Sequence, residues 1–277
     1  MKTILVPTDF SDAARNASEY AVEYAREFGY KLLLCHIYHL PVMSVPEEPL
    51  LVMENPKVLR KNHLESLRAE AAFLSKDKHV DIECQVAEGF AVDEILSIES
   101  EIKPELIMMG METEGAFSEL IIGSIATDVI RKTKTPIILV PEKAKFKKIE
   151  RITLAYDYKL KQEVNILDPL KELLNASKAK LFILNVGKQD PLQDAEKAIA
   201  GIKLEKYFSD SVFTSHFSES EDFTAGVNNF VESSSTDLIA MIPHKHNFLE
   251  RLFKESHTKK IAFHTNVPLL ALPEVHF

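Results

Sequence analysis

The sequence has little cysteine and no long apolar run. Its two cysteines, Cys35 and Cys84, both stand inside apolar segments typical of strands, so we expect reduced, buried thiols rather than disulfides or a metal site. No apolar run approaches the roughly 20 residues that a membrane-spanning helix needs. The segment after Met1 lacks the basic and long apolar regions of a secretory signal. These absences predict a cytoplasmic protein that does not associate with membranes.

The sequence also has fewer basic than acidic residues. The chain has 33 Lys and Arg against 42 Asp and Glu, which gives a formal net charge of -9. Binding to nucleic-acid phosphates requires a concentrated basic face, so no nucleic-acid partner is expected. The densest basic cluster consists of Lys143, Lys145, Lys147 and Lys148, and we interpret it as a solvated linker between the two halves of the chain.

Signatures of common nucleotide-dependent and hydrolytic enzymes are missing as well. The sequence has no P-loop G-x4-G-K-[ST], no Rossmann G-x-G-x-x-G and no G-x-S-x-G nucleophile elbow. No catalytic residue is therefore assigned. An enzyme is the least favoured class, and weak ATP hydrolysis is the one activity left open.

The first half alternates between apolar strands and amphipathic helices. We predict strands at 3–6, 31–37, 80–87, 106–109 and 136–140, and helices at 12–28, from about 56 to 75, at 92–102 and at 122–132. Ser11 is the predicted N-cap of the first helix. Strands separated by helices imply parallel crossovers, hence an α/β fold with a doubly wound sheet covered by helices on both faces.

The second half repeats this order. "KTILVPTDF" aligns with "ERITLAYDY", which places Asp9 opposite Asp157. At one constant offset in residue number, "PELIMMG" aligns with "TDLIAMI" and "TPIILVP" with "VPLLALP". The 277 residues exceed the usual size of one domain. We therefore predict two tandem domains, 1–143 and 149–277, that arose from a fused repeat.

Candidate binding residues follow the strands of the first half. In doubly wound sheets, ligands bind beyond the carboxyl ends of the strands, where the strand order reverses. Thr8 and Asp9 follow the first strand, and Gly110 follows the fourth and leads through a loop to Gly123 and Ser124. Such a turn can present N–H groups and a hydroxyl to phosphate at the positive end of a helix. An ordinary turn with Ser124 as N-cap is the alternative.

The order of these motifs resembles the universal stress protein family. The matching segments are "ILVPTDFS", "LLLCHI", "AEGF" and "LIMMG…GSIATDVIRKTKTPIILVP", and the resemblance covers nearly the whole chain. It implies two five-stranded parallel sheets of the adenine-nucleotide alpha-hydrolase-like fold. It also implies that the final strands, 136–140 and 267–272, pair to form an internal pseudo-dimer, which would hide two exposed edges.

In its nucleotide-binding branch the resemblance implies ATP or AMP, with Mg²⁺ if ATP is bound, held by a loop of pattern G-x2-G-x9-G-[S/T]. Carried onto this sequence, the implied binding residues are Pro7, Thr8, Asp9, Ile37, Met109, Gly110, Gly123, Ser124 and Ile125. Thr113 occupies the middle glycine position, with Gly115 two residues later, and a β-branched residue weakens a loop that needs positive φ. Asp9 as a helix cap and Ile37 as a core residue are the plainer alternatives.

The second half departs further from the nucleotide pattern. Ile242, Lys245 and Glu255 stand where the first half has Gly110, Thr113 and Gly123, and a carboxylate there would repel phosphate. No nucleotide is expected in this half. It concentrates histidines instead, at His244, His246, His257 and His264. Their spacing does not support a metal site, and we interpret the segment as a contact with another domain or an anionic ligand.

Two functions are weighed from the sequence. The first is a stress-response regulator or sensor that binds ATP or AMP in its first domain. The second is a nucleotide-free scaffold or interaction module with protein partners, and a homodimer of the whole chain stays open. The Pro-rich segment 40–56 fits either function, as a lid or as an interface.

Overall fold

The computed structural model describes residues 1–39, 55–76, 78–114, 119–121, 123–156, 164–187, 194–243 and 266–273. The first half contains β1 (Thr3–Pro7), α1 (Asp12–Phe28), β2 (Lys31–Tyr38), α2 (Pro56–Ser75), β3 (Ile82–Glu88), α3 (Ala91–Ile102), β4 (Leu106–Glu114), β5 (Glu119–Ile121), α4 (Ser124–Lys132) and β6 (Ile137–Pro141). The second half contains β7 (Arg151–Ala155), η1 (Val164–Leu167), α5 (Asp168–Ser177), β8 (Lys180–Gly187), α6 (Asp194–Tyr207), β9 (Phe213–Glu219), α7 (Phe223–Ser234), β10 (Leu238–Met241) and β11 (Leu269–Ala271).

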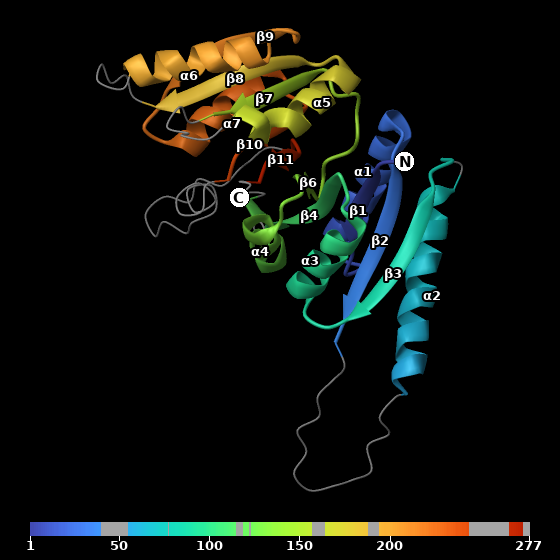
Figure 1. Cartoon of the computed structure of the whole chain (residues 1–277). Helices are drawn as coiled ribbons and strands as arrows, with labels where there is room; N and C mark the ends of the chain where they lie inside the picture. The colour runs from blue at the N-terminus through green and yellow to red at the C-terminus, as the bar shows by residue number, and fades with distance from the viewer. Residues whose placement is uncertain are drawn as a thin grey trace, which may run out of the picture.

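One continuous sheet runs through both halves (Figure 1). Its strand order is β3-β2-β1-β4-β6-β11-β10-β7-β8-β9, with β5 attached to β4 off this path. In each half the first strand lies in the middle of five. The second and third strands lie on one side of it and the last two on the other. The pairs within these two sets of five are parallel, which confirms the predicted doubly wound α/β fold.

The two halves meet through an antiparallel pair of strands. β6 pairs with β11 in the register Ile137↔Ala271, Ile138↔Leu270 and Leu139↔Leu269. This confirms the predicted pairing of the final strands. Because each half ends in a short apolar strand, the pairing covers two edges that would otherwise be exposed to other chains.

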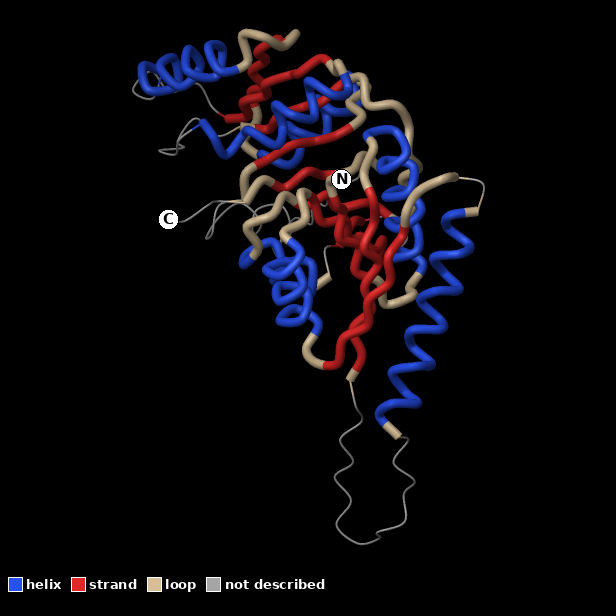
Figure 2. Tube along the Cα trace, turned by 45° about the vertical axis from the view of Figure 1, so that its right-hand side comes forward, coloured by secondary structure: helices blue, strands red, loops and turns tan. Residues whose placement is uncertain are grey.

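Helices cover both faces of the sheet, and Figure 2 shows the strands as the layer between them. One apolar cluster packs α1, α2, α5 and α6 against one face, and a second packs α3, α4 and α7 against the other. Helix α1 begins and ends where the sequence predicts. Ser11 Oγ accepts a hydrogen bond from Ala14 N, and Gly29 closes the helix in the left-handed conformation with φ 74°.

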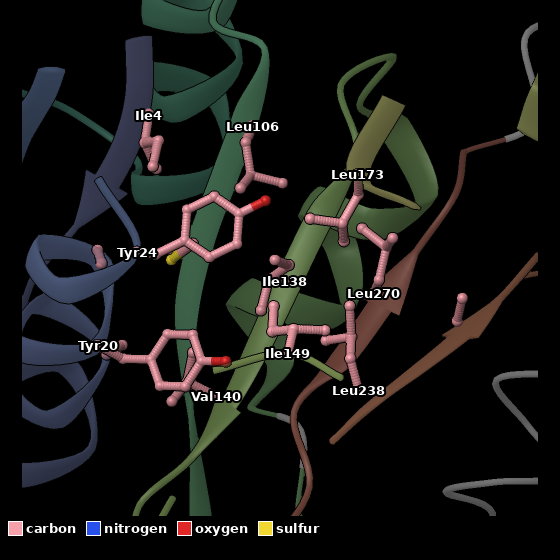
Figure 3. Close-up of a cluster of buried hydrophobic side chains, with 14 of the residues drawn as sticks. Ile4, Tyr20, Tyr24, Leu106, Ile138, Val140, Ile149, Leu173, Leu238 and Leu270 are labelled. Carbon is pink, nitrogen blue, oxygen red and sulfur yellow. The ribbon is translucent and has the colours of Figure 1, made fainter. Parts of the chain in front are cut away.

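The first of these clusters crosses the junction between the halves (Figure 3). Tyr24 from α1 and Ile138 from β6 belong to the same buried cluster as Leu173 from α5 and Leu270 from β11. Burial of apolar surface is the main stabilising contribution in folding. The two halves therefore share part of their core.

The basic connection between the halves is tied to both of them. Lys145 Nζ donates to Asn16 Oδ1 at 2.8 Å and Glu19 Oε2 at 3.0 Å in the first half. Lys147 Nζ lies 2.8 Å from Oδ1 of the buried Asp237 in the second half. The lysine side chains are exposed, as expected of a solvated linker, but they also form ion pairs with each half. In the described part of the chain, no helix is long and apolar enough to cross a membrane.

We expect the full chain to unfold in a single transition, because the sheet and one core cluster are continuous across the junction. Leu270 is 2% exposed. Leu270→Ala should lower the free energy of unfolding by about 2–5 kcal/mol and shift that transition without splitting it. Urea unfolding followed by far-ultraviolet circular dichroism and tyrosine fluorescence measures both effects. Two separate transitions in the unaltered protein would contradict this expectation.

Candidate functional site

The candidate site lies at the carboxyl ends of β1 and β4, where the strand order of the first half reverses. β1 pairs with β2 from Thr3↔Lys31 to Pro7↔Cys35, so that ladder runs along the whole strand. The described ladder between β1 and β4 consists of Ile4↔Leu106 and Leu5↔Ile107. The two strands therefore part toward their carboxyl ends, which is the position where doubly wound sheets bind ligands.

A tight turn follows β1 at this point. Thr8 is buried, and its N–H extends the ladder by donating to Cys35 O at 2.8 Å. Phe10 N donates to Thr8 Oγ1 at 3.1 Å, and Ser11 N donates to Asp9 Oδ1 at 3.0 Å. Asp9 is exposed and stabilises the turn before the helix, whereas Ser11 is the cap itself. The alternative that Asp9 caps α1 is therefore wrong.

The turn contains a strained residue. Phe10 has φ 66°, a conformation that residues other than glycine seldom adopt. Such a conformation costs on the order of 1–3 kcal/mol and persists where the surroundings impose it, often at functional sites. Here two side-chain acceptors hold the turn, and the Phe10 ring packs against His36 with centroids 4.4 Å apart. The strain presents the Asp9 carboxylate at the surface beside β1.

Gly110 is required by packing. A Cβ atom at this position would lie 2.4 Å from Ala13 O and 2.5 Å from Ala13 C. The first turn of α1 thus rests directly on β4, and Met109 beside it is buried at 8% exposure. Asp9 follows β1 and Gly110 lies on the neighbouring strand β4, and the glycine has a role in helix packing that the sequence pattern did not reveal.

The expected loop after Gly110 is instead a β-hairpin. The strand predicted at 106–109 continues to Glu114 and pairs with β5 in the register Glu112↔Ile121, Thr113↔Leu120 and Glu114↔Glu119. The expectation of a loop is therefore wrong over these residues. A β-branched residue at position 113 favours extended backbone, which explains the result. Gly115 lies outside the described residues.

Helix α4 begins at the end of this hairpin. Gly123 is its N-cap with φ -57° and no side-chain hydrogen bond, and Ser124 is the first helical residue. The predicted helix at 122–132 is confirmed with a start two residues later, and the alternative of Ser124 as N-cap is wrong. Gly123, Ser124 and Ile125 are all exposed. The first N–H groups of α4 have no capping side chain, so this end of the helix can receive an anion.

Ile37 and Pro7 complete the set of predicted residues. Ile37 is half-buried near the end of β2 and packs against the apolar cluster of the α3 and α4 face, which agrees with the core alternative for this residue. Pro7 is the buried last residue of β1. Most predicted site residues of the first half thus lie near the carboxyl end of β1 or β2 or at the start of α4, whereas Met109 and Gly110 lie in the middle of β4.

A histidine pair beside Thr8 was missed by the sequence analysis. His36 is 7% exposed, and its Nδ1–H donates to Thr8 O at 2.8 Å. On the other side of the ring, Nε2 of His36 shares a hydrogen bond with Nδ1 of His63 at 3.1 Å. His63 from α2 also stacks on Tyr38, with centroids 4.5 Å apart. The signal was a histidine inside the apolar strand "KLLLCHIY".

The corresponding edge of the second half is only partly described. Ile242, which replaces Gly110, follows β10 and is buried at 4% exposure. Asp157, Lys245, Glu255 and the histidines at 244, 246, 257 and 264 lie outside the described residues, as does most of the Pro-rich segment 40–56. The second half thus has a buried aliphatic side chain at the position where the first half has a glycine packed against α1.

Comparison with known proteins gives consistent matches. A model of the universal stress protein family matches residues 1–141. A universal stress protein of Thermus aquaticus is 33% identical over 139 residues, which is 50% of this chain and 98% of that protein. Another, of Methanocaldococcus jannaschii, is 26% identical over 145 residues, or 52% of this chain and 84% of that protein.

A solved structure extends the likeness to the whole fold. The crystal structure of a universal stress protein from Archaeoglobus fulgidus covers 98% of each chain with a TM-score of 0.74 at 17% sequence identity. At this identity the match shows the fold. It includes both halves of the chain.

Gly110→Ala should destabilise the protein by about 1–3 kcal/mol, because the added methyl group meets the backbone of α1 and forces the helix away from β4. Chemical denaturation measures the loss. Gly187→Ala is the matched control, since a Cβ there has no neighbour within 4 Å and Gly187 has no positive φ. Equal stability of the two variants would contradict the assigned packing.

The histidine pair should make stability depend on pH. Burial, and to a lesser extent the neighbouring His36, lowers the pKa of His63 below its usual 6.5. The unfolded chain then binds a proton more readily than the folded one, so stability rises with pH from the lowered pKa up to about 6.5. His63→Gln should flatten this slope in thermal unfolding between pH 5 and 8. An unchanged slope would show that His63 does not cause it.

Proposed function

The chain belongs to the universal stress protein family, and from this premise we propose that its first half binds an adenine nucleotide, ATP or AMP, at the carboxyl edge of β1 and β4. The observation that carries the proposal is the start of α4, which follows the β4–β5 hairpin in the chain and has no capping side chain. Backbone N–H groups at a helix start, with the positive end of the dipole, favour a phosphate group.

Each predicted residue has a role in this proposal. The N–H groups of Ser124 and Ile125 and the Ser124 hydroxyl contact a phosphate. The exposed Asp9 carboxylate accepts from a ribose hydroxyl. Ile37 and Met109 form an apolar boundary for the adenine ring, while Pro7, Thr8 and Gly110 shape the backbone around it. If ATP is the ligand, Mg²⁺ enters with its phosphates.

We also propose two domains, 1–143 and 149–277, of which only the first binds nucleotide. The second half has a buried Ile242 where the first has Gly110, and Glu255 where the first has Gly123. Binding to one half of a shared sheet suits a regulator or sensor in the stress response, located in the cytoplasm. No catalytic residue is proposed.

A nucleotide-free scaffold is the second candidate function. One observation favours it: Thr113, at the middle position of the family's glycine loop, is paired with Leu120 in the β4–β5 ladder. The backbone there is committed to a hairpin and does not wrap around phosphates. In this alternative the same edge would contact a protein partner.

Calorimetric titration with ATP and AMP in the presence of Mg²⁺ tests the proposal. We expect one binding site in the unaltered protein and at least a tenfold loss, about 1.4 kcal/mol, in Gly123→Glu, because a carboxylate at the start of α4 repels phosphate. The variant should fold, since a Cβ at position 123 has open space and negative charge suits a helix start.

Gly187→Glu is the control for added charge, because its Cβ is equally free and it lies in the second half. It should bind as the unaltered protein does. Absence of binding to the unaltered protein would favour the scaffold. Undiminished binding in Gly123→Glu would place the phosphate elsewhere.

A further inference from the structure

A pocket of about 480 Å³ opens between the two halves at the amino-terminal edge of the first half's strands. Lys2, Tyr30 and Glu105, which line it, each directly precede β1, β2 or β4. The opposite wall comes from α5 of the second half, including Leu173 and Ala176. The pocket therefore lies at the other end of the sheet from the candidate nucleotide site.

The pocket has the size and lining of a small-molecule site. Ligand sites commonly measure about 300–1,000 Å³, are mostly apolar and often lie between domains. Here the aromatic side chains of Tyr24, Phe28 and Tyr30 contribute from the first half, and Leu173 and Leu270 from the second. A ligand with a single aromatic ring fits such a lining, because aromatic side chains pack well against other rings.

The Tyr24 hydroxyl supplies a polar group inside the pocket. Tyr24 is 4% exposed and lines the pocket, and the structure describes no hydrogen bond between its hydroxyl and another described residue. In Figure 3 the hydroxyl points from α1 toward the space between Leu106 and Leu173. Burial raises the pKa of Tyr24, so the hydroxyl stays protonated and can both donate and accept.

The charges at the mouth favour a cation. Lys2 Nζ donates to Glu172 Oε2 at 2.6 Å, which neutralises both groups. Glu105 Oε2 accepts from Thr3 N at 2.7 Å, a bond that leaves its charge in place. Two carboxylates thus face one ammonium group, that of Lys2, which also lies 6.0 Å from the centroid of the Tyr30 ring.

We propose that this interhalf pocket binds a small aromatic amine. The ring lies among Tyr24, Phe28 and Leu173, a hydroxyl on the ring pairs with the Tyr24 hydroxyl, and the ammonium group lies at the mouth near Glu105 and Glu172. Because the ligand contacts both halves, it stabilises the folded chain through their junction. This proposal does not depend on nucleotide binding.

Three phenols that differ in charge test it by calorimetry on the full chain: the cation tyramine, the neutral 4-ethylphenol and the anion 4-hydroxyphenylacetate. We expect saturable one-site binding of tyramine and affinities in that order, with at least a tenfold difference between cation and anion. Glu172→Gln should reduce this preference. No saturable binding of tyramine, or tighter binding of the anion, would overturn the proposal.

Two variants locate the site. Tyr24→Phe removes a hydroxyl that has no described partner, so the fold should persist while tyramine binds about tenfold more weakly. Ala176→Phe, at an exposed position of α5, fills the pocket from the second half and should abolish binding. Circular dichroism verifies that both variants fold. Undiminished binding in both would place the amine elsewhere and refute the site.

Discussion

The antiparallel pairing of β6 with β11 is the contact on which the rest of the molecule depends. Three residue pairs join two five-stranded sheets into one, and the core cluster around Ile138 and Leu270 continues across them. The pairing removes two exposed edges. It also places α5 beside the amino ends of the first half's strands, which creates the pocket between the halves. The carboxyl ends of β1 and β4 remain separate from this junction.

Local patterns in the sequence predicted most of the fold. Helix α1 and its Ser11 cap follow from the periodicity of apolar residues and from capping chemistry. The pairing of the final strands follows from the family resemblance, together with the two apolar strands at matching places in the halves. The pairing of β4 with β5 did not follow, because Thr113 is paired with Leu120 of another strand. The hydrogen bond between His36 and His63 joins β2 to α2, and no spacing rule signals such a contact.

The candidate site was likewise predictable in its local patterns but not in its long-range contacts. The place of Asp9 after β1 and of Gly110 on the neighbouring strand β4 could be predicted, since the carboxyl ends of parallel strands lie at the same end of a sheet. The reason for Gly110 could not, because it depends on the approach of Ala13 from α1. The strained Phe10 turn likewise depends on packing against His36. The two ends of the first half's strands thus carry different chemistry. The uncapped start of α4 belongs to the carboxyl ends, and an aromatic pocket with excess negative charge lies at the amino ends.

Hydrogen exchange of the backbone amides tests the continuous sheet most directly. Amides buried in a cooperative core exchange only on global unfolding, whereas edge strands open locally. The account predicts that the hydrogen-bonded amides of β6 and β11 exchange as slowly as those of β1 and β7, the middle strands of each half. Exchange in β6 and β11 as fast as in the edge strands β3 and β9 would contradict it.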